Sequence, residues 1–217
     1  SSLAPLADPV DYLTKTPPVE VELPAVSGEV VAEGRFDAID LFLMLAARVD
    51  PHEALDTIDL WAGSAYRTSD DGGLVCTTAT IAAHPSITAS TAEVATANLA
   101  AALEQWRSRM PASANASVTA QPGKVEVRTC DPGIAADQAI QGNPSDAMVL
   151  PVSRIAAMGI RLEAGDPPTT ATCAATTWIR GATLEQLRTG DGLDPAVIRE
   201  ELTVASDTCP DRHGCPE

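Results

Sequence analysis

The sequence has few aromatic residues and no long apolar run. Aromatic residues make up 3% of its 217 residues, whereas hydrophobic residues reach 45%. The core must therefore consist mainly of Ala, Val, Leu and Ile, and such small side chains favour close packing of helices on a sheet over large cavities. The longest apolar-rich run, near residues 41–47, is shorter than the roughly 18 residues that a membrane span needs, and it predicts a buried helix instead.

Basic residues are also scarce. The net charge at pH 7 is −16, and only Lys15 and Lys124 among the 14 basic residues are lysines. A surface this acidic repels the phosphates of nucleic acids, which bind proteins largely through Lys and Arg, and it disfavours anionic lipid headgroups. We therefore predict no nucleic-acid partner. The simplest interpretation of the charge is that it keeps the protein in solution.

The sequence lacks the common catalytic and metal-binding motifs. It has no GxSxG, SxxK, GK[ST], HExxH or CxxC pattern, and its three histidines are scattered. The C-terminal group of Cys209, His213 and Cys215 is the best candidate for a metal site, but a structural site needs a fourth ligand. We therefore predict no catalytic, metal-binding or cofactor-binding residues, and no enzymatic activity.

The positions of the five cysteines favour disulfides over buried thiols. Cys130 and Cys209 lie in polar segments that contain proline, and Cys215 lies in a tail with glycine and proline. A free cysteine that serves as a small core residue is not expected in such segments. Disulfides form in oxidising compartments, so we predict an exported protein.

Proline and glycine divide the chain into three predicted parts. Residues 1–34 contain five prolines and predict an extended lead-in, a spacer from a membrane anchor, with a β-like piece at 19–23 or 29–32. Residues 35–165 predict an α+β core, and residues 166–217 predict a C-terminal helical unit packed on this core. Apolar periodicity and capping residues predict helices at 36–47, 51–61, 90–110, 145–158, 172–180, 184–187 and 194–202.

Three predicted strands, near residues 74–82, 115–120 and 124–129, form a small mixed sheet packed by helices in an α+β fold. The helix between the first two strands makes them parallel if they share a sheet. The third strand follows through a hairpin turn and is therefore antiparallel to both. If it lies beside the first strand, Cys130 at its end meets Cys76 at the start of the first, which predicts a Cys76–Cys130 disulfide.

The tryptophans Trp61, Trp106 and Trp178 are each predicted on a helix with apolar neighbours. The simplest expectation is that they anchor the core. A core of small residues does not need three indole rings, however, so a ligand groove lined by these tryptophans is the alternative.

The C-terminal part resembles exported cell-envelope proteins of actinobacteria of the mycobacterial type. The similar pattern is a cysteine that opens a helix (Cys173), a short helix, a Gly/Asp turn and a closing helix that ends near Cys209; it covers about 40 residues. The preference for Arg over Lys is also typical of actinobacterial genomes. The resemblance implies a Cys173–Cys209 disulfide that closes the C-terminal unit and leaves Cys215 over. A Cys209–Cys215 disulfide with a buried free Cys173 is the rival.

The overall plan, with an anchor and one soluble domain, is similar to that of accessory factors for trehalose-monomycolate transport, although no diagnostic motif is shared. The resemblance implies a non-enzymatic protein on the extracytoplasmic, periplasmic side of the membrane, held by an N-terminal anchor and acting as an accessory or scaffold to envelope lipid (mycolate-type) transport. Its expected partner is a membrane transport protein or another envelope protein, with lipid as a further candidate.

Two other functions remain as alternatives. One is a small-ligand or lipid-binding module with a tryptophan-lined groove, which an apolar pocket of several hundred Å³ would favour. The other is a hydrolase with an unfamiliar motif, which a buried histidine–carboxylate pair beside a serine or cysteine would favour.

Overall fold

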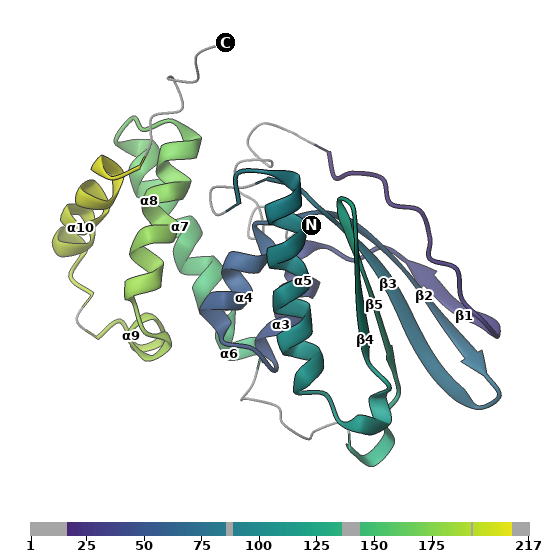
Figure 1. The fold of residues 1–217 in the computed structure, drawn as a ribbon. Helices are drawn as coiled ribbons and strands as arrows, with labels where there is room; N and C mark the ends of the chain where they lie inside the picture. Colours follow the sequence, from purple (N-terminus) through teal and green to yellow (C-terminus); the bar gives the residue numbers. More distant parts are fainter. Residues whose placement is uncertain (1–16, 86–88, 136–143, 192, 210–217) are drawn as a thin grey trace, which may run out of the picture. The chain divides into compact units, whose positions relative to one another are not determined.

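A computed structural model describes residues 17–85, 89–135, 144–191 and 193–209. The chain divides into two compact units. We call Pro17–Ser145 the sheet unit, and the unit that begins at Asp146 the helical unit. Figure 1 shows the elements of both.

The sheet unit contains an antiparallel sheet of five strands in the order β1-β2-β3-β5-β4. The strands are β1 (Glu29–Gly34), β2 (Trp61–Asp71), β3 (Leu74–Ala83), β4 (Ser117–Gln121) and β5 (Lys124–Cys130). The α+β class and the three predicted strands are confirmed. Every neighbouring pair is antiparallel. Strands β3 and β4 run in the same direction, as we expected, but β5 lies between them, so they do not pair. The sheet is therefore not of the mixed type that we expected.

Strand β2 is absent from the prediction, and the placement of Trp61 on a helix is wrong. The preceding helix ends at Ile58, and Trp61 is the first residue of β2. The turn at residues 70–73 has two glycines with positive φ and a hydrogen bond from the Gly73 N–H to Asp70 Oδ1 (2.6 Å). A turn of this kind closes a hairpin, which requires a strand on both of its sides.

Three helices lie on one face of the sheet (Figure 1): α3 (Ala38–Ala46), α4 (Pro51–Ile58) and α5 (Ala92–Ser108). Asp50 caps α4 ahead of Pro51, as the sequence predicts. Asp37 caps α3 in a capping box with Asp40. Helix α5 packs on β3, β4 and β5. Side chains alternate along β5: Val125 and Val127 are buried, while the charged residues between and beside them are at least partly exposed.

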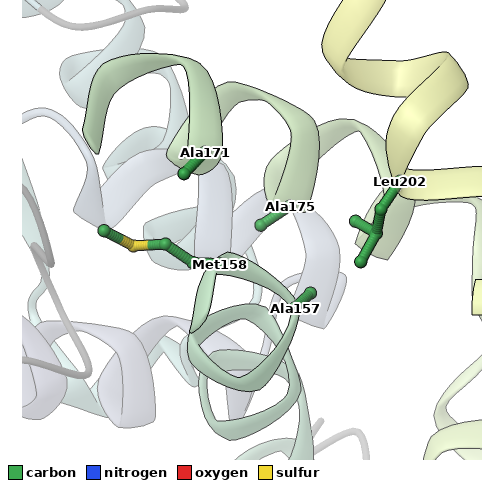
Figure 2. Packing of buried hydrophobic residues seen from close by; sticks show 5 residues of the cluster. All are labelled: Ala157, Met158, Ala171, Ala175 and Leu202. Atoms are coloured by element: carbon green, nitrogen blue, oxygen red, sulfur yellow. The ribbon is translucent and has the colours of Figure 1, made fainter. Parts of the chain in front are cut away.

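The helical unit consists mainly of three packed helices, α7 (Val149–Glu163), α8 (Pro168–Gly181) and α10 (Pro195–Asp207), with the short α9 (Leu184–Thr189). The short helix α6 (Pro144–Ala147) precedes them. Figure 2 shows a core cluster in which Leu202 of α10 points towards Ala157 of α7 and Ala175 of α8. Met158 and Ala171 complete it. Alanine at these positions lets the helix backbones approach closely.

The boundary between the two units falls between residues 145 and 146 of the chain, whereas we expected it between residues 165 and 166. The difference arises from α7, which we expected in the α+β core. Its residues Ala157 and Met158 pack against α8 and α10. The predicted lead-in, 1–34, also ends differently, because Glu29–Gly34 is the edge strand β1 and pairs with β2. Residues 1–16 lie outside the described residues.

The structure contains two disulfides. Cys76–Cys130 joins β3 to β5 at directly opposite positions, as the predicted topology requires. Cys173–Cys209 joins α8 to the residues after α10; this is the pairing that the resemblance implied, and it excludes the Cys209–Cys215 rival. Residues 210–217, and with them His213 and Cys215, lie outside the described residues. Two disulfides are typical of oxidising compartments and indicate an extracytoplasmic location. Within the described residues, no helix combines the length and the apolar character that a membrane crossing requires.

Candidate functional site

Helix α10 presents two apolar faces. Asp194 caps the helix by accepting a hydrogen bond from the Ala196 N–H (2.7 Å), and Pro195 occupies the first turn. Leu202 and Ala205 face inwards and are buried. On the outer side, Val197 and Val204 are 46% and 61% exposed. The two valines thus form a short exposed apolar strip on a helix that already has a buried face.

A groove of about 690 Å³ runs along α10 and reaches from this outer side to the buried Ala205. We call it the α10 groove. Its walls come from the C-terminal half of α8, from α9 and from α10. It is lined by Thr177, Trp178, Gly181, Ala182, Gln186, Leu193, Val197, Glu200, Glu201, Val204, Ala205 and Thr208. It is an open groove, and the described residues that line it are mainly small or apolar.

Trp178 forms one wall of the α10 groove. Its ring is partly buried, and its Nε1–H donates a hydrogen bond to Glu201 Oε2 (3.0 Å), which links α8 to α10. A smaller hollow of about 180 Å³ touches the same side chain, between α7, α9 and α10. Leu193 also lines both hollows. Because its N–H already has a partner, Trp178 offers mainly apolar surface to a bound molecule.

The charges in the α10 groove have one sign. Among the described lining residues, Glu200 and Glu201 are the charged ones, and both are exposed. Gln186 at the end of the groove belongs to the capping box of α9, where its Oε1 accepts a hydrogen bond from the Thr183 N–H (2.9 Å). The groove therefore presents carboxylate oxygens beside apolar surface.

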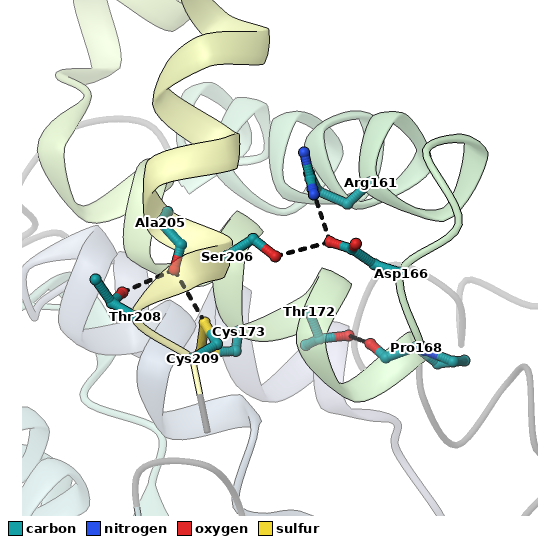
Figure 3. Close-up of a disulfide and its surroundings, with 9 residues drawn as sticks. All are labelled: Arg161, Asp166, Pro168, Thr172, Cys173, Ala205, Ser206, Thr208 and Cys209. Carbon is teal, nitrogen blue, oxygen red and sulfur yellow. Dashed lines mark hydrogen bonds and ion pairs between the residues drawn. A yellow bond between two sulfur atoms is a disulfide. The ribbon is translucent and has the colours of Figure 1, made fainter. Parts of the chain in front are cut away.

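Two sets of contacts hold the helices around the groove (Figure 3). The Cys173–Cys209 disulfide ties the end of α10 to α8. At the end of α7, Arg161 Nε lies 2.7 Å from Asp166 Oδ2, and the Ser206 hydroxyl of α10 donates to the same oxygen (2.8 Å). Arg161 also donates to the Thr203 hydroxyl (2.9 Å). These contacts fix the position of α10, so the groove is largely formed before anything binds.

The hydrogen bond from Arg161, and then that from Ser206, lower the pKa of Asp166 against the opposing effect of burial. A carboxyl group whose pKa is lower in the folded state stabilises the fold above its unfolded pKa of about 3.9, and this stabilisation is lost as the pH falls through the folded pKa. We expect Asp166→Asn to lower the free energy of unfolding by about 1–3 kcal/mol at pH 7. Urea denaturation should show a clearly smaller difference between the two proteins near pH 3. An equal difference at both pH values would contradict this role of Asp166.

Trp61 and Trp106 lie in the sheet unit. Trp106 is 4% exposed and is a core residue of α5, as the simplest expectation held. Trp61 lines a separate hollow of about 540 Å³. The other described residues of that hollow are Pro17, Pro18, Val19, Arg35, Phe36, Asp37, Asp40 and Ser64.

The polar side chains of the Trp61 hollow are mostly engaged locally. Ser64 donates to the Phe36 carbonyl (2.5 Å), and Asp37 and Asp40 form the capping box of α3. The buried Nε1 of Trp61 has no hydrogen-bond partner among the described residues. This hollow is smaller and offers less apolar surface than the α10 groove.

The three tryptophans thus contribute differently. Trp178 lines the α10 groove, whereas the other two belong to the sheet unit. Val197 and Val204 were not predicted as site residues, although the sequence holds a signal for them. The stripe of Ile198, Leu202 and Ala205 already gives α10 one apolar face, so the two valines seven residues apart form a second one.

No group of metal-ligating side chains occurs among the described residues. His52 lies 3.7 Å from Asp50, at the capped start of α4, and both side chains are partly exposed.

No protein-family model, curated protein or solved structure matches the chain. The fold and the disulfides define it as an α+β protein of an extracytoplasmic compartment with a disulfide-closed helical unit.

Proposed function

We propose that this chain is a non-enzymatic cell-envelope protein that binds a protein partner in the α10 groove. In this role it acts as an accessory or scaffold to envelope lipid transport of the mycolate type. The observation that carries the proposal is the exposed apolar surface of Val197 and Val204 beside Trp178.

The composition of the groove supports a protein partner. Interfaces combine an apolar centre, often with an aromatic residue, and a polar rim. Here Trp178, Val197 and Val204 provide the apolar centre, and Glu200 and Glu201 provide the rim. The disulfide and the Arg161–Asp166 ion pair hold the walls in place, which lowers the entropy cost of binding.

The location proposed for this activity is the outer face of the cytoplasmic membrane. The two disulfides support an oxidising compartment. We propose that an N-terminal anchor holds the protein there and that the proline-containing stretch before β1 serves as a spacer. The partner is then a membrane transport protein or another envelope protein.

Affinity capture of the full-length, anchored protein from its own membranes tests this function. We expect a membrane protein to be recovered with the wild type and at least about fivefold less of it with Val197→Asn combined with Val204→Asn, because apolar contacts at the centre of an interface dominate affinity. The matched control carries Val30→Asn and Val94→Asn, at residues of the sheet unit that are 45% and 43% exposed. Equal recovery with all three proteins, or recovery of no membrane protein, refutes the function.

The volume of the groove favours a second candidate, a binding module for a small apolar ligand or lipid. Small-molecule sites occupy about 300–1,000 Å³, and the α10 groove has about 690 Å³. Organic extraction of the purified protein distinguishes the two functions. A lipid recovered in equimolar amount from the wild type, and lost with the groove substitutions, would favour the module.

A further inference from the structure

We infer that the α10 groove binds an amphipathic helix of the partner protein, and that this helix carries Lys or Arg beside its apolar residues. This inference rests on the proposed function, because it specifies what the groove holds.

The arrangement of the lining residues favours a helical occupant. On α10 and its C-cap, the lining residues are 197, 200, 201, 204, 205 and 208. Residues three, four and seven positions apart in this set lie on one side of the helix. This face extends over three helical turns, or about 16 Å at 1.5 Å per residue. A straight lining of this length on α10, with α8 beside it, fits an α-helix of the partner, as in complexes in which a helix binds in a groove.

The spacing of the apolar residues supports the same occupant. Val197 and Val204 are seven residues apart and therefore project from nearly the same side of α10. Apolar residues of an incoming helix at positions i, i+3 or i+4, and i+7 would pack against this pair.

Small residues of α8 leave room for the occupant's backbone. A Cβ atom added to Gly181 would have no neighbouring atom within 4 Å, apart from its own chain neighbours and helix backbone. Ala182 lies beside it in the lining. A helix backbone can therefore approach this wall of the groove closely.

The charges of the groove favour an occupant with positively charged side chains. Glu200 and Glu201 are acidic, and the described lining contains no basic residue. Hydrogen bonding of the Trp178 indole to Glu201 uses the N–H that would otherwise attract an anion. A Lys or Arg of the occupant is complementary to this surface, whereas an anionic lipid headgroup is repelled.

Titration of the purified full chain with designed helical peptides of about 18 residues tests this inference. One peptide carries Leu at i, i+3 and i+7 with Lys at the flanking positions, and the matched peptide carries Glu in place of Lys. We expect the Lys peptide to bind at least about tenfold more tightly at low salt.

A protein variant without the two carboxylates tests whether they cause the preference for the Lys peptide. Glu200→Gln with Glu201→Gln keeps an oxygen acceptor for Trp178, and circular dichroism verifies that the fold is unchanged. We expect these substitutions to reduce the preference for Lys to less than about threefold. Equal binding of the two peptides by the wild type, or no binding of either, overturns the inference.

Vesicles of phosphatidylglycerol serve as the lipid probe. Binding of these vesicles that requires Val197 and Val204 would overturn the helical occupant in favour of a lipid. The capture experiment separates this failure from failure of the proposed function. A captured membrane protein that depends on the two valines, together with equal binding of both peptides, refutes the basic helix alone. Failure of capture refutes the function itself.

Discussion

Replacement of Cys173 and Cys209 by alanine should lower the stability of the helical unit by about 3–4 kcal/mol. The disulfide joins residues separated by 36 positions, so its loss returns considerable loop entropy to the unfolded chain. Cys209 is buried beside Ala174 and Ala205, and alanine preserves part of this packing. Hydrogen exchange of the α10 amides measures the effect, because the exchange rates report the free energy of opening of this helix.

The second disulfide provides the control for this prediction. Cys76 and Cys130 lie in the sheet unit, so their replacement by alanine should leave the exchange of the α10 amides nearly unchanged. Equal protection of α10 in the wild type and the Cys173/Cys209 variant would show that the disulfide does not hold this helix.

Leu202→Ala should lower the free energy of unfolding by about 2–5 kcal/mol. Leu202 is 0% exposed and is the large aliphatic side chain of a cluster that also contains Ala157, Ala171 and Ala175. Alanines cannot extend into the space that the leucine leaves, so the substitution creates a cavity. Chemical denaturation of the full chain, followed by circular dichroism of its helices, measures the loss.

Val204→Ala is the matched control, since it removes an aliphatic side chain from the same helix. Val204 is 61% exposed, and its truncation should change stability by no more than about 0.5 kcal/mol. A comparable loss in both variants would contradict the assignment of two separate faces to α10.

Local rules predicted much of the fold. The turns and the alternation around residues 117–130 specify a hairpin, and the helix before it determines which strand ends can meet. This topology placed Cys130 opposite Cys76, and the register of β3 and β5 confirms it. The helix starts at Asp50 and Asp194 likewise followed from capping chemistry, which depends on neighbouring residues alone.

Features that depend on tertiary contacts were missed. Strand β2 contains Gly63, Ser64 and Ala65, which have weak strand propensity, and both of its neighbours in the sheet stabilise it. Helix α7 is amphipathic in either unit, so periodicity alone cannot assign it to the helical unit. Only its contacts with α8 and α10 decide the boundary.

The α10 groove was predicted in part. The sequence offered Trp178 as one of three residues that line a groove, but it could not separate this tryptophan from two others in a different unit. The second apolar stripe of α10 gave a local signal. Its meaning depends on α8 and α9, which supply the opposite walls of the groove.

The central claim is that the α10 groove is the surface through which the protein binds its partner. Gly181→Leu tests it most directly, since a leucine there extends into the groove from a position with open space. The same substitution at Gly159 of α7, which also has open space and does not line the groove, is the control. In affinity capture from native membranes, we predict that Gly181→Leu keeps the thermal stability of the wild type and recovers little partner, whereas Gly159→Leu recovers it fully. Undiminished recovery with Gly181→Leu would contradict the account.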